Sequence, residues 1–206
     1  MRRPDADAVA RRRDVVLAGH RGDAGSARAA LHDDDDGVRA SALGALQRCG
    51  ALSSAELLAA LDDASALVRD RALTIAAVHG ADEQLDHRLV ALLSDDDTTV
   101  AETAAWAIGE RPHAGTASVA ALCTMAVEHD DALCREAAVA ALGSLGDPAA
   151  LGAILHATSD RATVRRRAII ALAAFDGPEV DAALTRALED RDWQVRQAAE
   201  DLLADD

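Results

Sequence analysis

The sequence repeats one phrase six times: an apolar residue, an Asp-rich turn, a valine followed by an arginine, and an apolar helix. The valine, replaced once by cysteine, sets the register, and successive copies stand 30 to 34 residues apart. These anchor positions are Val38, Val68, Val100, Cys134, Val164 and Val195. A repeat of this length holds two helices and two turns, and one such pair cannot bury its apolar face alone, so the pairs must stack on one another.

Two further columns of residues place the anchors on one face of a helix. Alanine stands four residues after every anchor, and an apolar residue stands eight residues after every anchor. The second column is Leu46, Ala76, Ile108, Leu142, Leu172 and Leu203. Offsets of zero, four and eight share one face of an α-helix, so they predict the buried stripe of the second helix in each pair. The alanines predict where adjacent helices approach most closely.

The turns between the helices are rich in aspartate, which predicts N-terminal caps for the second helices. The arginine after each anchor, missing only at Ala101, predicts ion pairs with turn acids of its own or a neighbouring repeat. A calcium loop is disfavoured because no turn has the ligand order of an EF-hand. Gly50, Gly80 and Gly146 predict helix C-caps.

The periodicity predicts an all-α fold, a right-handed α-solenoid (α-α superhelix) of about six helix pairs behind an N-terminal capping helix. We expect a single domain over residues 1–206. The cap is expected at about 5–22 and the pairs at about 24–50, 54–80, 83–111, 115–146, 147–176 and 177–206. Half of the residues are hydrophobic but only three are aromatic, so Ala, Leu, Val and Ile must build the core.

Net charge and composition exclude several classes of function. The formal net charge of −15 disfavours nucleic acid and anionic membranes as partners and favours a basic protein segment. No apolar run has the length of a signal-peptide core or a membrane span, so we expect a cytoplasmic protein. We expect no metal, no cofactor and no catalytic residue. The three cysteines include no CxxC pair, the histidines are scattered, and the sequence has neither a phosphate loop nor a nucleophile elbow.

The phrases Leu-Gly-Asp-Pro-Ala-Ala-Leu at 145–151 and Val-Arg-x-x-Ala at the anchors resemble the HEAT-like repeats of the bilin-lyase type. The resemblance covers nearly all of residues 24–206 and implies the solenoid fold, while such repeats serve in scaffolds, assembly factors and a few enzymes. Similar deoxyhypusine hydroxylases carry His-Glu dipeptides for a di-iron centre, and this sequence has none. Similar alkylpurine DNA glycosylases use a basic, aromatic groove, which an acidic chain with three aromatics does not provide.

In stacks of this kind the second helices line the concave side, and the residues two and six after each anchor point away from the core. At one such position stands Trp106, flanked by Glu102, Glu136 and Asp70, which predicts an apolar anchor in an acidic groove that suits an Arg- or Lys-containing segment. The alternative is that Trp106 packs onto the neighbouring repeat. The candidate partner-binding residues are Trp106, Glu102, Glu136, Asp70, Thr74, Ile170 and Arg166.

Two other features of the same helices are ambiguous. The cluster Arg165, Arg166 and Arg167 is either a basic end of the groove or a salt-bridged, solvated face. Trp193, two residues before its anchor, is expected to pack within the last repeat.

The sequence therefore predicts a non-catalytic protein–protein interaction or scaffold module that binds a partner segment on its concave face. Two alternatives stay open: a bilin-lyase-like enzyme or enzyme accessory, including an assembly factor, and a structural segment of a larger assembly.

Overall fold

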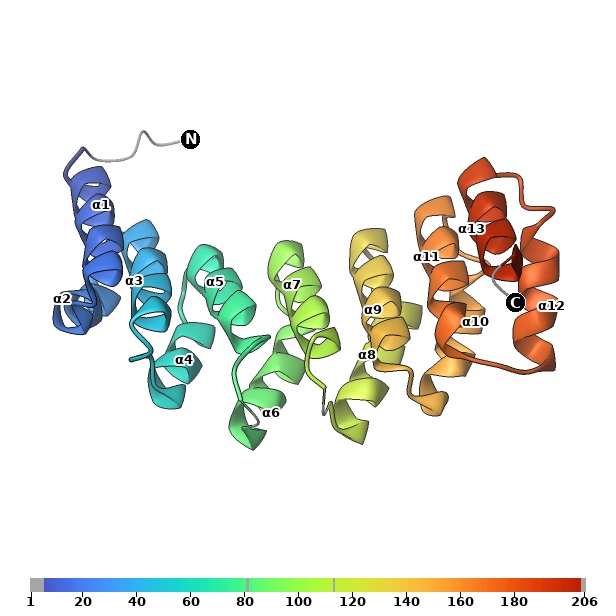
Figure 1. Ribbon diagram of the computed structural model, residues 1–206, viewed down its shortest axis with the longest axis horizontal. Helices are drawn as coiled ribbons and strands as arrows, with labels where there is room; N and C mark the ends of the chain where they lie inside the picture. Colours follow the sequence, from blue (N-terminus) through green and yellow to red (C-terminus); the bar gives the residue numbers. More distant parts are fainter. Residues whose placement is uncertain (1–5, 81, 113, 205–206) are drawn as a thin grey trace. The chain divides into compact units, whose positions relative to one another are not determined.

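The computed structural model describes residues 6–80, 82–112 and 114–204, and within those ranges the chain consists of helices and the turns between them (Figure 1). The all-α solenoid expected from the sequence is thus confirmed. Residue contacts divide the chain into two compact units, Met1–Arg88 and Leu89–Asp206, with the boundary inside helix α6 (Glu83–Leu92). A single domain over residues 1–206 stays a prediction.

The first unit contains one single helix followed by two helix pairs. The single helix is α1 (Ala6–Arg21). The pairs are α2 (Ala24–Ala29) with α3 (Asp36–Arg48), and α4 (Ser54–Leu61) with α5 (Ala66–Ala76); a short 3-10 helix, Ala30–His32, follows α2. Because α3 contacts both α1 and α5, these three helices form one layer, and α2 and α4 pack against it.

The second unit repeats this plan. The end of α6 precedes α7 (Thr98–Gly109). Three pairs follow: α8 (Thr116–Glu128) with α9 (Ala132–Leu145), α10 (Leu151–Ala157) with α11 (Ala162–Ala171), and α12 (Pro178–Ala187) with α13 (Trp193–Ala204). Short 3-10 helices, Pro148–Ala150 and Leu172–Ala174, precede α10 and follow α11. Helices α7, α9, α11 and α13 contact one another in that order and form one row, while α8, α10 and α12 form the other (Figure 1).

The buried stripe of the second helices agrees with the sequence pattern at almost every position. All six anchors are at most 2% exposed, and all six alanines of the next column are fully buried. Five of the six residues in the third column are also buried, whereas Leu203 is 39% exposed because no helix of the described residues packs beyond α13.

The turns cap the helices as the aspartates predict. The side chains of Asp35, Asp97 and Asp131 accept hydrogen bonds from backbone N–H groups in the first turns of α3, α7 and α9. At the other ends, Gly50 and Gly146 adopt the left-handed conformation with φ 61°, which a residue with a Cβ rarely adopts. The prediction of a C-cap at Gly80 is wrong, because Ala77 caps α5 and Gly80 follows in the loop.

The arginine after the anchor joins consecutive turns. Nε and Nη2 of Arg165 donate to the two carboxylate oxygens of Asp190 in the next repeat, at 2.8 and 2.7 Å, while Nη1 donates to the carbonyl oxygen of Asp160 in its own turn at 2.8 Å. The same arrangement recurs in the pairs Arg39–Asp63 and Arg135–Asp160. We call this set the Arg–Asp ladder. A planar guanidinium suits the task because it binds a carboxylate through two parallel hydrogen bonds.

The ladder is interrupted between α7 and α9, where both members of one pair are replaced. The arginine position holds the buried Ala101, and the acid position of the following turn holds His129. Nδ1 of His129 accepts the backbone N–H of Asp131 at 3.1 Å, which is the role that Asp190 performs for the backbone N–H of Asp192 in its own turn. The turn keeps its internal hydrogen bond while the bond between repeats is lost.

The ladder yields a stability prediction for the pair Arg165–Asp190, whose side chains are 7% and 15% exposed. Arg165→Met and Asp190→Asn should each lower the free energy of unfolding by about 2 kcal/mol, since each leaves a largely buried partner unpaired. The loss of unfolding free energy in the double variant should be smaller than the sum of the two single losses by about 1–3 kcal/mol, as measured by urea denaturation. Additive losses would show that the pair contributes no coupling.

The same pair makes the stability of the fold depend on pH. The hydrogen bond from Arg165 lowers the pKa of Asp190 in the folded chain. Its stabilising effect is therefore present above the unfolded-state pKa of about 3.9 and is lost as the pH falls through the lower folded value. The stability difference between wild type and Asp190→Asn should accordingly shrink in acid.

Candidate partner-binding face

The second helices of the second unit expose one side of their row. On α7, α9 and α11 the residues two and six after the anchors are half-buried or exposed, and α13 continues the pattern. We call this surface the second-helix face; it comprises Glu102, Trp106, Glu136, Ala140, Arg166, Ile170, Gln197 and Asp201. Its two large apolar members are Trp106, 43% exposed, and Ile170, 39% exposed.

Trp106 lies near the end of α7, and its neighbours Ala105 and Ala107 are fully buried. The ring is partly covered by the protein, yet more than two fifths of the residue stays in contact with water. Burial of that remaining surface by a partner is favourable in proportion to its apolar area. A side chain of this size and type is among those that dominate binding energies at protein interfaces.

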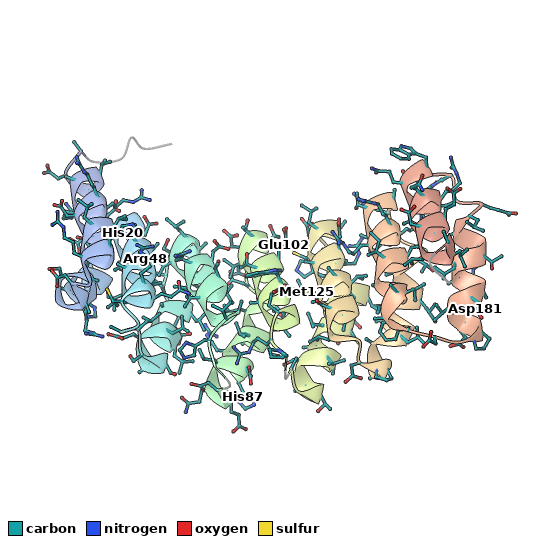
Figure 2. The ribbon with its side chains drawn as sticks, in the orientation of Figure 1. His20, Arg48, His87, Glu102, Met125 and Asp181 are labelled. Carbon is teal, nitrogen blue, oxygen red and sulfur yellow. The ribbon has the colours of Figure 1, made fainter. Side chains whose placement is uncertain are left out.

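Glu102, which is labelled in Figure 2, lies on α7. It precedes Trp106 by four residues, or about one helical turn. Its pKa is raised, first by burial and then by the negative charges of Asp131 and Glu136. Glu136 has a cationic neighbour, since Nη2 of Arg167 lies 3.5 Å from its Oε1. Glu102 has no hydrogen bond or ion pair with any described residue, so its ionised form is poorly compensated in the isolated chain.

The three consecutive arginines of α11 point to different partners. Arg165 belongs to the Arg–Asp ladder, and Arg167 reaches Glu136. Arg166 is exposed and forms no ion pair with the residues that the structure describes. Two of the three thus form the salt-bridged face that was one of the alternatives, and the second-helix face retains a single uncompensated guanidinium.

Trp193 was not expected at this surface, and the prediction that it packs within the last repeat is wrong. It begins α13 and is 65% exposed. Together with Arg166, Ile170 and Gln197 it lines a hollow of about 190 Å³. The helical wheel explains its position: a residue two before the anchor lies about 160° from it, on the side opposite the core and roughly 40° from the position two after the anchor. The wheel that places Trp106 on the exposed side therefore places Trp193 there as well.

Two residues of the expected set lie in the first unit. Asp70 and Thr74 are half-buried on α5, and the hydroxyl of Thr74 donates to the backbone carbonyl of Asp70 at 3.0 Å. Their grouping with Trp106 into one groove stays a prediction.

The cysteine in the anchor column behaves as a core residue. Cys134 is fully buried, and its pKa is raised to about 11, first by burial and then by the charges of Glu102 and Asp131. The thiol therefore stays protonated at neutral pH and is a poor nucleophile. Among the described residues no three His, Cys, Asp or Glu side chains are grouped so that they could hold a metal ion. None of the helices described is both long and apolar enough to cross a membrane.

Comparison with solved structures shows the same fold in natural and designed proteins. The Escherichia coli protein YibA is 16% identical, with 99% of this chain and 77% of that chain covered and a TM-score of 0.66. The designed armadillo repeat protein YIII(Dq)4CqI is 22% identical over 85% of this chain and 96% of its own, with a TM-score of 0.58. A second designed armadillo protein, YIII(Dq.V1)4CPAF in complex with the peptide (KR)4, is 18% identical over 93% and 97%, with a TM-score of 0.57.

Comparison with protein families is more specific. No curated protein matches the chain. The family model for HEAT repeats matches residues 85–163 and 119–204, which together make up more than half of the sequence. The chain therefore belongs to the family of HEAT repeat proteins.

Proposed function

We propose that this chain is a non-catalytic protein-interaction module whose second-helix face binds an extended segment of a partner protein, with a basic residue of that segment beside Trp106 and Glu102. The observation that carries the proposal is the pairing of an exposed tryptophan with an uncompensated, partly buried carboxylate one helical turn away. A cytoplasmic location and a protein partner, rather than nucleic acid or membrane, are part of the proposal.

The chemistry of this pair favours a cation. In the free chain, burial and two neighbouring carboxylates penalise the charge on Glu102. A lysine or arginine placed next to Glu102 offsets this penalty, and its stem or guanidinium covers the ring of Trp106. The net charge of −15 also attracts a basic segment at long range and accelerates the encounter.

The fold is compatible with such a ligand. The designed armadillo protein with (KR)4 holds a basic peptide on a solenoid of similar architecture. At 18% identity this likeness concerns the architecture alone. No observation on the described residues specifically favours the bilin-lyase-like alternative.

Substitution of Trp106 tests the proposal. With a fluorescently labelled (KR)4 peptide as probe, Trp106→Ala should weaken binding at least about tenfold, as expected for a central aromatic anchor. The substitution leaves the net charge unchanged, so attraction to the acidic chain in general is retained. Fluorescence anisotropy at physiological salt gives the affinity, and circular dichroism establishes that the variant is folded.

The matched control is Val127→Ala, which truncates an apolar residue of similar exposure, 39%, on α8 in the other row of helices. It should bind the peptide like wild type. Equal affinity of Trp106→Ala and wild type, or an equal loss in the control, would contradict the proposed face.

Glu102 predicts a trade-off between stability and binding. Glu102→Gln should raise the free energy of unfolding at neutral pH by about 0.5 kcal/mol, because it removes a charge that the folded chain compensates poorly. It should also weaken binding of the Lys-Arg peptide. Thermal unfolding and anisotropy measure the two effects, and a destabilised variant with unchanged binding would show that Glu102 is an ordinary structural residue.

The carboxylate of Glu102 should also make peptide binding depend on pH. Since the pKa of Glu102 is raised in the folded chain, its destabilising charge is present above that value and disappears below the unfolded pKa of about 4.3. Affinity for the basic peptide should fall as the pH drops through the raised value, and Glu102→Gln should lose this part of the pH dependence.

A further inference from the structure

A second subsite lies on the second-helix face, between α11 and α13, and its chemistry differs from that around Trp106. We propose that the bound segment carries charges of both signs: a basic residue at Trp106 and Glu102, then, roughly six residues along, an apolar side chain and a carboxylate that dock at Trp193, Ile170 and Arg166. This inference rests on the proposed function and names the class of segment that the face accepts.

The hollow at this subsite has the size of one side chain. Its volume of about 190 Å³ lies below the 300–1,000 Å³ that is typical of pockets for small molecules. Ile170 of α11 and Trp193 of α13 both line it, and these residues are 39% and 65% exposed. Two large apolar groups left open to water around one small hollow fit an aliphatic side chain of a partner, whose burial removes both from solvent.

The charge at the same place fits a carboxylate. Arg166 lines the hollow, is exposed and has no ion pair with a described residue, unlike Arg165 and Arg167. Asp201 also lines the hollow and keeps its negative charge, but its Oδ1 accepts a hydrogen bond from Nε2 of Gln197 at 2.8 Å and it forms no ion pair with Arg166. The free donors of Arg166 can therefore bind an incoming carboxylate through two parallel hydrogen bonds.

The surface between the two subsites leaves room for an extended backbone. A shallow hollow of about 330 Å³ lies between α9 and α11; Arg167 and Ile170 line it together with small residues such as Ala140, Gly143 and Ala171. At the position six after the anchor, which Trp106 and Ile170 both occupy, the intervening α9 carries the small Ala140; Glu136 occupies the position two after its anchor.

The spacing follows from helix packing. Adjacent helix axes lie about 8–10 Å apart, so the two steps from α7 to α11 cover roughly 20 Å. An extended chain advances about 3.3 Å per residue, which places roughly six residues between the basic residue and the carboxylate. A purely basic segment keeps the contact at Trp106 and Glu102 but brings a cation to Arg166, so it should bind less tightly than a segment with a carboxylate there.

The test uses two synthetic peptides that differ in one residue. Both carry Arg-Lys near one end and, after a Gly/Ser spacer of about six residues, Leu followed by either Glu or Gln. Wild type should bind the Glu peptide about fivefold more tightly than the Gln peptide by fluorescence anisotropy, a ratio at the upper end of the range for an exposed ion pair. Arg166→Glu should abolish or reverse this preference.

A control variant separates the site from net charge. Arg161→Glu changes the net charge by the same amount at an exposed position that does not line the hollow, and it should keep the fivefold preference for the Glu peptide. Trp193→Ala should weaken both peptides alike and leave their ratio unchanged, because it removes the apolar contact only.

The outcomes distinguish this inference from the proposed function. If both peptides bind wild type equally and Trp106→Ala weakens both, the inference is overturned and the binding face stands. If neither peptide binds and (KR)4 does not bind either, the proposed function itself fails. If Arg161→Glu loses the preference as fully as Arg166→Glu, the effect is one of overall charge and the subsite is overturned.

Discussion

The guanidinium that binds a carboxylate of the next turn is the interaction on which the regular parts of this stack depend. Each helix pair is too small to bury its apolar face alone, so the pairs must meet in one defined register. The anchor and alanine columns allow close approach, and pairs such as Arg165–Asp190 fix one turn against the next through two directional hydrogen bonds. Because these constraints lie on the packed sides of the second helices, their opposite sides are free to vary.

Several departures from the repeat pattern occur together where α7 packs against α9. Between α7 and α9 the repeat loses an Arg–Asp pair to Ala101 and His129 and replaces the anchor valine with Cys134. At the same junction the exposed side gains Trp106 and the uncompensated Glu102. Stability alone gives no reason for these last two choices, since an exposed tryptophan adds little to the isolated fold and a partly buried, unpaired carboxylate disfavours it. We interpret them as positions that serve binding at some cost in stability.

The sequence predicts the repeating part of the fold well because burial at offsets of zero, four and eight is a local property of each helix. The sequence predicts less where a contact or a pKa depends on residues of a neighbouring repeat. The stacking of the repeats determines that the acid which pairs with Arg165 lies in the next repeat. The raised pKa of Glu102 depends first on its burial and then on carboxylates 29 and 34 residues further along the chain. The exposure of Trp193 follows from its offset from the anchor only when that offset is placed on the helical wheel. A glycine near a helix end, such as Gly80, need not be its cap.

If the second-helix face of the second unit binds a peptide segment, the fluorescence of the chain's own tryptophans changes on binding. Trp106 and Trp193 are the only tryptophans of the sequence, tyrosine is absent, and both indoles are exposed. In Trp193→Phe all tryptophan emission comes from Trp106, so acrylamide quenching measures the accessibility of that one ring. Saturation with (KR)4 should lower the quenching constant and shift the emission to shorter wavelength. Unchanged quenching while anisotropy shows the peptide bound would place the binding surface elsewhere and contradict the account.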